Sequence, residues 1–258
     1  MDHAEVLARY DREMRAGARP DGPGSRIERT GRLVRQTGPA HGWNGILWSG
    51  LDADGADEAI EEQKTHFTGL GLAFEWKVYG HDRPADLARR LVAAGFTPEA
   101  EETLMAAETA AVPLGTGAPE GVHILPVTDA AGAGLVADVH EQAFGTDGTR
   151  LRQRLLDQLA ATPDTVVAVL ALAGGTPVAA ARMELVPGTA FAGLWGGGTV
   201  PAWRRRGVYR ALVAHRARIA ADRGYRYLQV DASDDSRPVL QRLGFAPLTT
   251  TTPYVHLP

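Results

Sequence analysis

Three arginines and a glycine stand together where a strand pattern gives way to a helix pattern. The segment 202–210 reads A-W-R-R-R-G-V-Y-R. The N–H groups in the first turn of a helix have no partners within the helix and carry partial positive charge, so they bind phosphate. Guanidinium groups at the same place strengthen that binding, and Gly207 has no Cβ to keep a ligand away from the backbone. The segment therefore predicts a diphosphate site.

The elements on both sides of this segment position it. Thr189–Val200 is predicted to be a strand whose end, Gly196–Gly198, lacks side chains. Glycines inside a strand mark a bulge or a place where a ligand or another chain comes close, so we expect a backbone surface left open here. Arg206–Arg223 is predicted to be a helix, because apolar residues from Val208 onward recur on one face, and Gly224 ends it.

This strand–turn–helix matches neither the P-loop nor the dinucleotide glycine pattern. Arg204-x-x-Gly207 resembles the R/Q-x-x-G-x-G/A motif of the GNAT acyltransferases, although Tyr209 stands where that motif has Gly or Ala. The predicted order of helices and strands and the stretch L-Q-R-L-G-F support the resemblance, which covers about Gly121–Pro258. It implies an α/β (α+β) fold, with a central mixed, mostly antiparallel sheet flanked by helices.

The resemblance also implies acetyl-CoA as co-substrate and no metal. Backbone groups of the strand end would contact the pantetheine arm, and the N–H groups that start the helix would surround the pyrophosphate. The implied cofactor-binding residues are Gly198, Thr199, Val200, Arg204, Arg205, Arg206, Gly207, Val208, Tyr209, Arg210 and Ser233. The acyl group would lie where the motif strand diverges from the strand that ends at Ser233.

The residues for proton transfer are less clearly marked. Many GNAT enzymes carry a tyrosine as general acid where this chain has Leu240. A thiol with a pKa of about 8.5 can leave as thiolate without an acid, so activity remains compatible with the sequence. We take Glu184, Asp231 and Tyr254 as candidate catalytic groups. The alternatives are an ion pair of Glu184 with its neighbour on the strand face, and a core position for Tyr254. A backbone N–H near Thr199 or Val200 would stabilise the oxyanion.

The N-terminal half repeats the C-terminal pattern of a strand, a turn with Arg-Pro, a short helix and Gly-Phe. We infer two diverged copies of one α/β unit: residues 1–112, a linker at 113–121, and the catalytic domain at 122–258. Acidic residues stand where the first copy would need arginines: Asp52, Asp54, Asp57 and Glu58. They would repel a pyrophosphate, so we predict a degenerate GNAT-like domain without a CoA site.

Composition narrows the classes of function. The 258 residues carry a formal net charge of −4, which disfavours nucleic-acid binding. The absence of cysteine excludes a thiol nucleophile and disulfides and fits a reducing compartment. The charged N-terminal segment predicts no signal peptide, and we find no apolar run of bilayer length. We therefore expect a cytoplasmic protein, a monomer or homodimer, without membrane partners.

The resulting hypothesis is an N-acetyltransferase that moves an acetyl group from acetyl-CoA, by direct attack, to a small-molecule or peptide amine. The missing tyrosine at position 240 keeps a non-catalytic acyl-CoA-binding sensor or scaffold as the alternative. A third possibility is a nucleotide-binding protein that uses the same anion site. The acceptor itself is not specified by the residues, because fold and motif do not define it.

Overall fold

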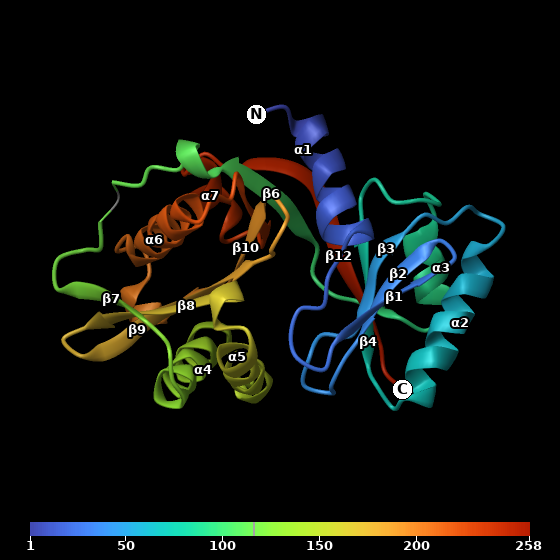
Figure 1. Ribbon diagram of the computed structural model, residues 1–258, viewed down its shortest axis with the longest axis horizontal. Helices are drawn as coiled ribbons and strands as arrows, with labels where there is room; N and C mark the ends of the chain where they lie inside the picture. The colour runs from blue at the N-terminus through green and yellow to red at the C-terminus, as the bar shows by residue number, and fades with distance from the viewer. Residues whose placement is uncertain (116) are drawn as a thin grey trace. The chain divides into compact units, whose positions relative to one another are not determined.

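The computed structural model describes residues 1–115 and 117–258, and contacts within the chain divide it into two units. Unit 1 comprises Met1, Ala106–Val230 and Asp235–Ala246. Unit 2 comprises Asp2–Met105, Asp231–Asp234 and Pro247–Pro258. Figure 1 labels the α-helices and most of the strands of both. Thr116, inside the predicted linker, lies outside the described residues.

The sheet of unit 1 is mixed and mostly antiparallel. Its strands follow the order β11, β10, β9, β8, β7, in which only the β10–β11 pair of these described strands is parallel. Their bounds are β7 Val122–Pro126, β8 Val166–Ala173, β9 Thr176–Leu185, β10 Phe191–Thr199 and β11 Tyr227–Ala232, of which residues up to Val230 belong to unit 1. The predicted fold class is confirmed.

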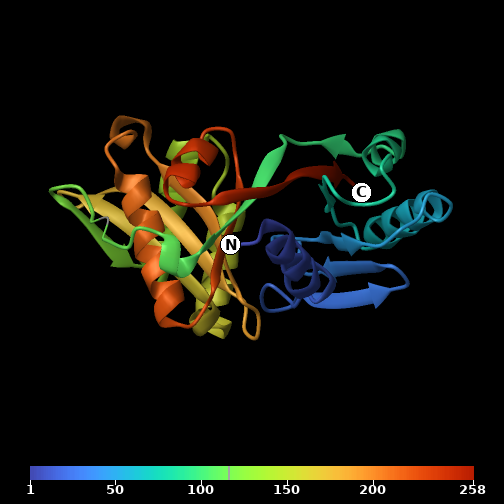
Figure 2. The ribbon, with the colours of Figure 1, turned by 90° about the horizontal axis from the view of Figure 1, so that it is seen from above.

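Helices cover both faces of this sheet. Helices α4 (Ala130–Phe144) and α5 (Thr149–Ala161) lie on one face, and α6 (Val208–Asp222) lies across the other, as Figures 1 and 2 show. Apolar residues spaced along each helix, such as Val136 and Leu212, enter one core with the alanine and valine side chains of β8 and β9. The short helix α7 (Arg237–Arg242) and 3₁₀ turns at Thr109–Ala111, Pro163–Thr165 and Pro201–Trp203 complete the unit.

Unit 2 also has a mixed sheet, with two helices packed on the face of Phe74 and Trp76 and the N-terminal helix contacting Tyr79 on the other face. Its strands are β1 Arg26–Thr30, β2 Leu33–Thr37, β3 Gly45–Ser49, β4 Phe74–Tyr79, β5 Thr97–Pro98 and β12 Ala246–His256, which lies in unit 2 from Pro247 onward. Strands β3 and β4 are parallel, and β12 is antiparallel to β4. The core contains Phe67 of α2 (Ala56–Gly69), Leu91 of α3 (Leu87–Ala93) and Trp76 of β4. Helix α1 (His3–Tyr10) continues into a π-helix, Asp11–Ala16.

The two units share one strand–helix–strand arrangement, as the sequence repeat predicts. In each, a parallel pair of strands is joined by one helix: β3, α2 and β4, and β10, α6 and β11. The first strand of each pair carries a bulge against its antiparallel neighbour, at Leu47 in β3 and at Gly196–Gly197 in β10. That the N-terminal half is a degenerate GNAT-like domain stays a prediction.

Three features of the fold differ from the expectations. The last strand, which carries Tyr254, begins at Ala246, and its register with β4 runs from Thr251 to His256. Residues from Pro247 onward therefore belong to unit 2, together with Asp231–Asp234. Strands β1, β2 and β6 (Glu102–Glu108) were not predicted; β1, for example, is polar and mostly exposed, so it has no apolar alternation to reveal it.

Candidate active site

The glycine run at the end of β10 forms a β-bulge. Trp195 pairs with Arg182 and Gly198 pairs with Ala180, so Gly196 and Gly197 together oppose a single residue of β9. Gly196 has a φ of 56°, in the left-handed region that favours glycine. The bulge bends the strand just before the turn that leads to α6.

Protein side chains fill the space that these glycines leave. A Cβ on Gly198 would lie 2.7 Å from Cε2 of Phe144 on α4. A Cβ on Gly197 would lie 2.9 Å from Cε2 of Tyr209 on α6. Both distances are too short for a real Cβ. The expectation that the missing side chains leave this whole surface open to a ligand is therefore wrong, because two helices pack closely against it.

Helix α6 begins without a side-chain cap. Its N-cap residue, Gly207, has a φ of 86°, and no side chain among the described residues accepts a hydrogen bond from the first turn. Arg205 also has a positive φ, 61°, which is uncommon for a residue with a Cβ. The first-turn N–H groups of an uncapped helix need other partners. This helix start is therefore compatible with anion binding, and the diphosphate site stays a prediction.

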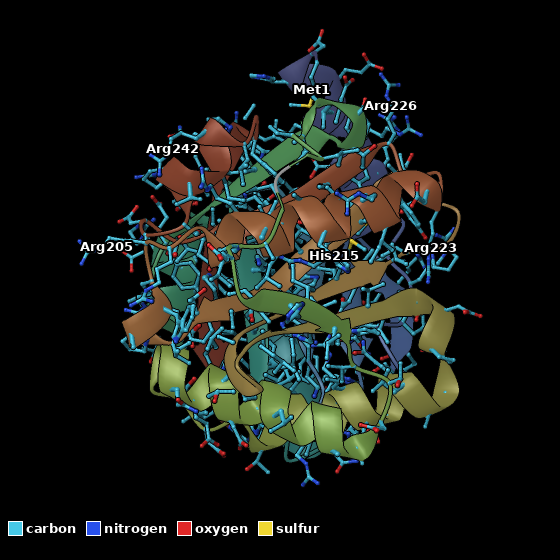
Figure 3. All side chains as sticks on the ribbon, turned by 90° about the vertical axis from the view of Figure 1, so that its left-hand side faces the viewer. Met1, Arg205, His215, Arg223, Arg226 and Arg242 are labelled. Atoms are coloured by element: carbon cyan, nitrogen blue, oxygen red, sulfur yellow. The ribbon has the colours of Figure 1, made fainter. Side chains whose placement is uncertain are left out.

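The arginines around the turn differ in their contacts. Arg204 donates from Nη2 to the Ala143 carbonyl at 2.7 Å and from Nε to the Thr199 carbonyl at 3.2 Å. Its side chain therefore ties the turn to α4 and β10 and is not free to bind phosphate. Arg206 lies over the Trp203 ring at 4.7 Å. Arg205 is exposed and points outward at the start of α6, where Figure 3 labels it.

Tyr209, the departure from the motif, turns its ring into the protein. The ring packs on Gly197, and burial raises the pKa of the hydroxyl. Val208 is buried as well. Both residues can therefore offer only their backbone to a ligand at the helix start. Because backbone N–H groups do the binding at such sites, a tyrosine at this position is compatible with the predicted cofactor site.

The backbone of Val200 is already engaged. Its N–H donates to the Val178 carbonyl at 3.0 Å, and its carbonyl accepts from the N–H of Trp203 at 2.9 Å. This excludes the N–H of Val200 as the oxyanion donor. Bulges interrupt the ladder and leave an extra residue unpaired, so the N–H groups of Gly196 and Gly197 are better candidates. The glycine run marked this place in the sequence, but the prediction placed the donor two to four residues later, at Thr199 or Val200.

The parallel pairing of β10 with β11 is short. It joins Phe191 with Tyr227, Ala192 with Leu228 and Gly193 with Gln229, and among the described residues it ends there. The bulge begins three residues after Gly193. The motif strand thus loses its pairing with β11 before it reaches the bulge, at the place where the sequence predicts divergence of the two strands.

Comparisons with known proteins agree with this geometry. Residues 135–245 match the family model described as the acetyltransferase (GNAT) family. These residues form a GNAT acetyltransferase domain. The matched segment begins in α4, contains the bulge and the arginine turn, and ends at Phe245. Acyl-CoA-dependent N-acetyl transfer is the general activity of this family. No curated protein sequence matches the chain significantly.

Solved structures extend the likeness in fold to nearly the whole chain. A GCN5-related N-acetyltransferase from Kribbella flavida is 21% identical, with a TM-score of 0.69 over 99% of this chain and 94% of that one. A conserved protein of unknown function from Staphylococcus epidermidis is 13% identical, with a TM-score of 0.70 over 94% and 96%. A tandem GNAT protein from the clavulanic acid biosynthesis pathway is 13% identical, with a TM-score of 0.61 over 99% and 94%. At these identities the likeness shows the fold alone.

Within the GNAT domain, Glu184 is held by two arginines. Its Oε1 accepts from Arg154 at 2.9 Å and from Gln158 at 3.4 Å, and lies 3.6 Å from Nη1 of Arg182. The ion pair with Arg182, a neighbour on the same face of the strand, is the alternative to a catalytic role that the sequence left open for Glu184. A carboxylate in these contacts is held as an acceptor, which favours the ion-pair alternative, and a catalytic role of Glu184 stays a prediction.

Asp231 is a member of unit 2 and is paired with Lys77. Nζ of Lys77 lies 2.5 Å from Oδ2, and the Asp231 side chain is 3% exposed. A buried carboxylate that forms an ion pair with an ammonium is poorly placed to contact an acceptor, and its catalytic role stays a prediction. Ser233, two residues later, is exposed, and its predicted role in cofactor binding stays a prediction.

Tyr254 belongs to the core of unit 2. It pairs with Trp76 across β12 and β4 and is buried with Phe96 and Leu91 in one cluster.

We expect the Tyr254→Phe variant to keep acetyl-transfer turnover within about twofold of wild type, because a core residue does not take part in proton transfer. Loss of a true general acid would lower turnover by about 10²–10⁴-fold. The measurement is initial-rate turnover at saturating acetyl-CoA. A hundredfold loss with unchanged melting temperature would restore Tyr254 as the acid.

Glu102 on β6 is a group that the sequence did not single out. Burial raises the pKa of its carboxyl to about 7, with Asp231 and Glu75 adding to the shift and Lys77 opposing it. A raised carboxyl pKa stabilises the fold at low pH, and this stabilisation is lost as the pH rises through about 7.

Glu102→Gln should therefore stabilise the protein at pH 8 by about 1–2 kcal/mol relative to wild type and have little effect at pH 4. Denaturant unfolding at both pH values checks this, and an equal effect at both would contradict it.

Within residues 1–115 and 117–258, no group of three or more His, Cys, Asp or Glu side chains could hold a metal ion. Among the same residues, no helix combines the length and the apolar content required to cross a bilayer. The predictions of a metal-free reaction and of a cytoplasmic protein stay predictions.

Proposed function

We propose that this protein transfers an acetyl group from acetyl-CoA to an amine of a small molecule or a peptide. The observation that carries the proposal is the uncapped start of α6, flanked by arginines, in a GNAT acetyltransferase domain. A phosphate needs hydrogen-bond donors and positive charge, and this turn offers both. Its two positive φ angles, at Arg205 and Gly207, aim successive backbone groups toward one side, as anion-binding turns do.

The residues of the turn fit the diphosphate of CoA. A Cβ on Gly207 would lie 3.2 Å from Nη2 of Arg210, so the glycine lets this guanidinium, whose charge suits a phosphate, approach the helix start. The N–H groups from Arg205 to Arg210 and the side chains of Arg205, Arg206 and Arg210 would hold the diphosphate. Arg204 would contribute by fixing the turn.

The transfer step needs little from the side chains. The amine nitrogen attacks the thioester carbonyl carbon, the new C–N bond forms, the C–S bond breaks, and the amine proton passes to solvent while the thiolate leaves. The N–H groups of Gly196 and Gly197 stabilise the charge on the carbonyl oxygen, and one such donor is worth about 10²–10³ in rate. Leu240 is fully buried where many relatives have a tyrosine, so the thiolate leaves without a protonated phenol beside it.

The N-terminal half has a different electrostatic character at the equivalent helix start. Helix α2 follows Gly55, whose N–H donates to Oδ1 of Asp52 at 3.0 Å, and Asp57 pairs with Arg90 at 2.8 Å. Carboxylates here compete for the N–H groups and repel phosphate. We therefore propose that unit 2 does not bind CoA.

Calorimetry and a thiol assay test the proposal together. Because the chain contains no cysteine, a thiol-reactive dye reports only the CoA that the reaction releases. We expect heat of binding with acetyl-CoA at one site, and dye signal with at least one member of a panel of small and peptide amines. Absence of binding to both CoA and acetyl-CoA would overturn the proposal.

The same experiment separates the alternatives. Tight acetyl-CoA binding with no turnover on any amine favours the non-catalytic sensor, which the buried Leu240 and the paired Asp231 keep under consideration. Displacement of CoA by ATP at equal affinity favours a nucleotide-binding protein.

A further inference from the structure

A buried arginine on α6 lies behind the bulge of β10. Arg216 is 1% exposed. Its Nη1 donates to the carbonyl of Arg182 at 2.6 Å, and its Nε donates to the carbonyl of Leu212 at 3.1 Å. Arg182 is the β9 residue that pairs with Trp195, the last paired residue of β10 before the bulge. Its Nη2 lies 3.6 Å from where a Cβ on Gly197 would be. Tyr209, two turns earlier on the same helix, packs on Gly197 beside it.

The charge of Arg216 is not neutralised. Among the described residues no carboxylate lies within ion-pair distance of it, and the partners found for its guanidinium are backbone carbonyls. Burial lowers the pKa of Arg216 to about 10, so the group remains protonated at neutral pH. A buried cation without a counter-ion is strongly disfavoured in a folded protein, so its presence here requires an explanation.

Unit 2 provides an internal comparison. Arg15 is also buried, at 2% exposure, and its Nε donates to the carbonyl of Leu47, the extra residue of the bulge on β3. There, however, two carboxylates neutralise the charge: Asp82 accepts two hydrogen bonds at 2.7 and 2.8 Å, and Asp11 accepts one at 2.8 Å. A buried arginine at such a bulge can therefore have its charge neutralised by carboxylates. Arg216 in the GNAT domain has no such carboxylate partners among the described residues.

We propose that Arg216 is a positioning residue of the transfer reaction: it holds the Gly196–Gly197 bulge from behind, and its unneutralised charge favours an anion on the bulge's backbone N–H groups. Tyr209 closes the space beside it. The inference rests on the proposed function, because acetyl transfer places negative charge on the thioester oxygen. Arg182 on β9 also lies near Gly196, but Glu184 pairs with it and partly neutralises its charge.

Kinetics of Arg216 variants test the proposal in the full chain. We expect Arg216→Met to lower kcat by about 30-fold, while the KM for acetyl-CoA and the calorimetric affinity for CoA stay within about twofold, because the diphosphate site is separate from the bulge. Arg218→Met is the matched control: it is the same change on the same helix, at an exposed side chain that donates to the Leu114 carbonyl. It should leave kcat unchanged.

A second pair of variants keeps the test decisive if Arg216→Met does not fold. Arg216→Lys retains the charge, and Arg216→Gln retains a hydrogen-bond donor without it. We expect kcat of the lysine variant to exceed that of the glutamine variant about tenfold. Equal kcat values in these two folded variants would overturn the role of the charge.

The glycine amides give a readout that does not depend on activity. We expect the backbone amide signals of Gly196 and Gly197 in nuclear magnetic resonance spectra, and their hydrogen-exchange rates, to change in Arg216→Gln but not in Arg218→Met. Unchanged signals in Arg216→Gln would overturn the positioning role. A wild-type protein that shows no transfer to any amine, but whose glycine signals respond as expected, would overturn the proposed function alone.

Discussion

The double variant Arg205→Glu, Arg206→Glu is expected to bind CoA about 100-fold more weakly than wild type. Each guanidinium would make a charge-assisted hydrogen bond to the diphosphate, and such bonds contribute about 1.5–3 kcal/mol each. Reversal of both charges also places two carboxylates at a helix start that should attract an anion. A loss of about 2.7 kcal/mol, close to the contribution of one strong contact, already corresponds to 100-fold in affinity. Isothermal calorimetry with CoA at moderate salt measures it.

A matched control excludes a general effect of charge. Arg89→Glu, Arg242→Glu makes the same change in net charge at two exposed arginines that lie outside the turn, on α3 and α7. Figure 3 labels Arg242. This control should bind CoA within about twofold of wild type, because neither arginine belongs to the helix start that offers N–H groups to the diphosphate, and salt screens exposed charges. If both double variants bind like wild type, the arginine turn does not hold the cofactor.

The Lys77→Met variant is expected to lose about 3–5 kcal/mol of the free energy of unfolding, which is the usual effect of removing one partner of a buried ion pair. The remaining Asp231 carboxylate would have no cation beside it. Glu75 and Glu102 interact electrostatically with Lys77 and Asp231, so their negative charges would further disfavour an unpaired Asp231 carboxylate. Urea unfolding at pH 7 measures the loss.

Two further variants define the origin of this loss. Lys77→Met combined with Asp231→Asn should recover most of the stability, because it removes the isolated charge and leaves the packing in place. Lys64→Met, at a more exposed ion pair with Glu61 on α2, should cost less than about 1 kcal/mol. Equal losses for Lys77→Met and Lys64→Met would show that the buried pair does not have the expected strength.

The tertiary structure reassigned several residues that seemed equivalent in the sequence. Asp231 and Tyr254 are both polar groups on predicted strands near the C-terminus. Asp231 meets Lys77, which is 154 residues away, and Tyr254 meets Trp76 across a strand pair that joins the chain's last residues to its first half. Neither contact leaves a trace in the local sequence, because period and composition report only which face of an element is apolar.

The sequence by itself determined the local elements and the chemistry of the turn. The pattern predicted a helix at Arg206–Arg223, and α6 is observed at Val208–Asp222, because helix ends and a 3.6-residue period are local properties. It also predicted the arginine-flanked helix start, since donors and charge there come from consecutive residues. Only the tertiary structure decided which side chains pack against the bulge and which carboxylates form ion pairs. It also decided that Arg216 is buried without a carboxylate partner among the described residues. These outcomes depend on residues that folding brings together from distant parts of the chain.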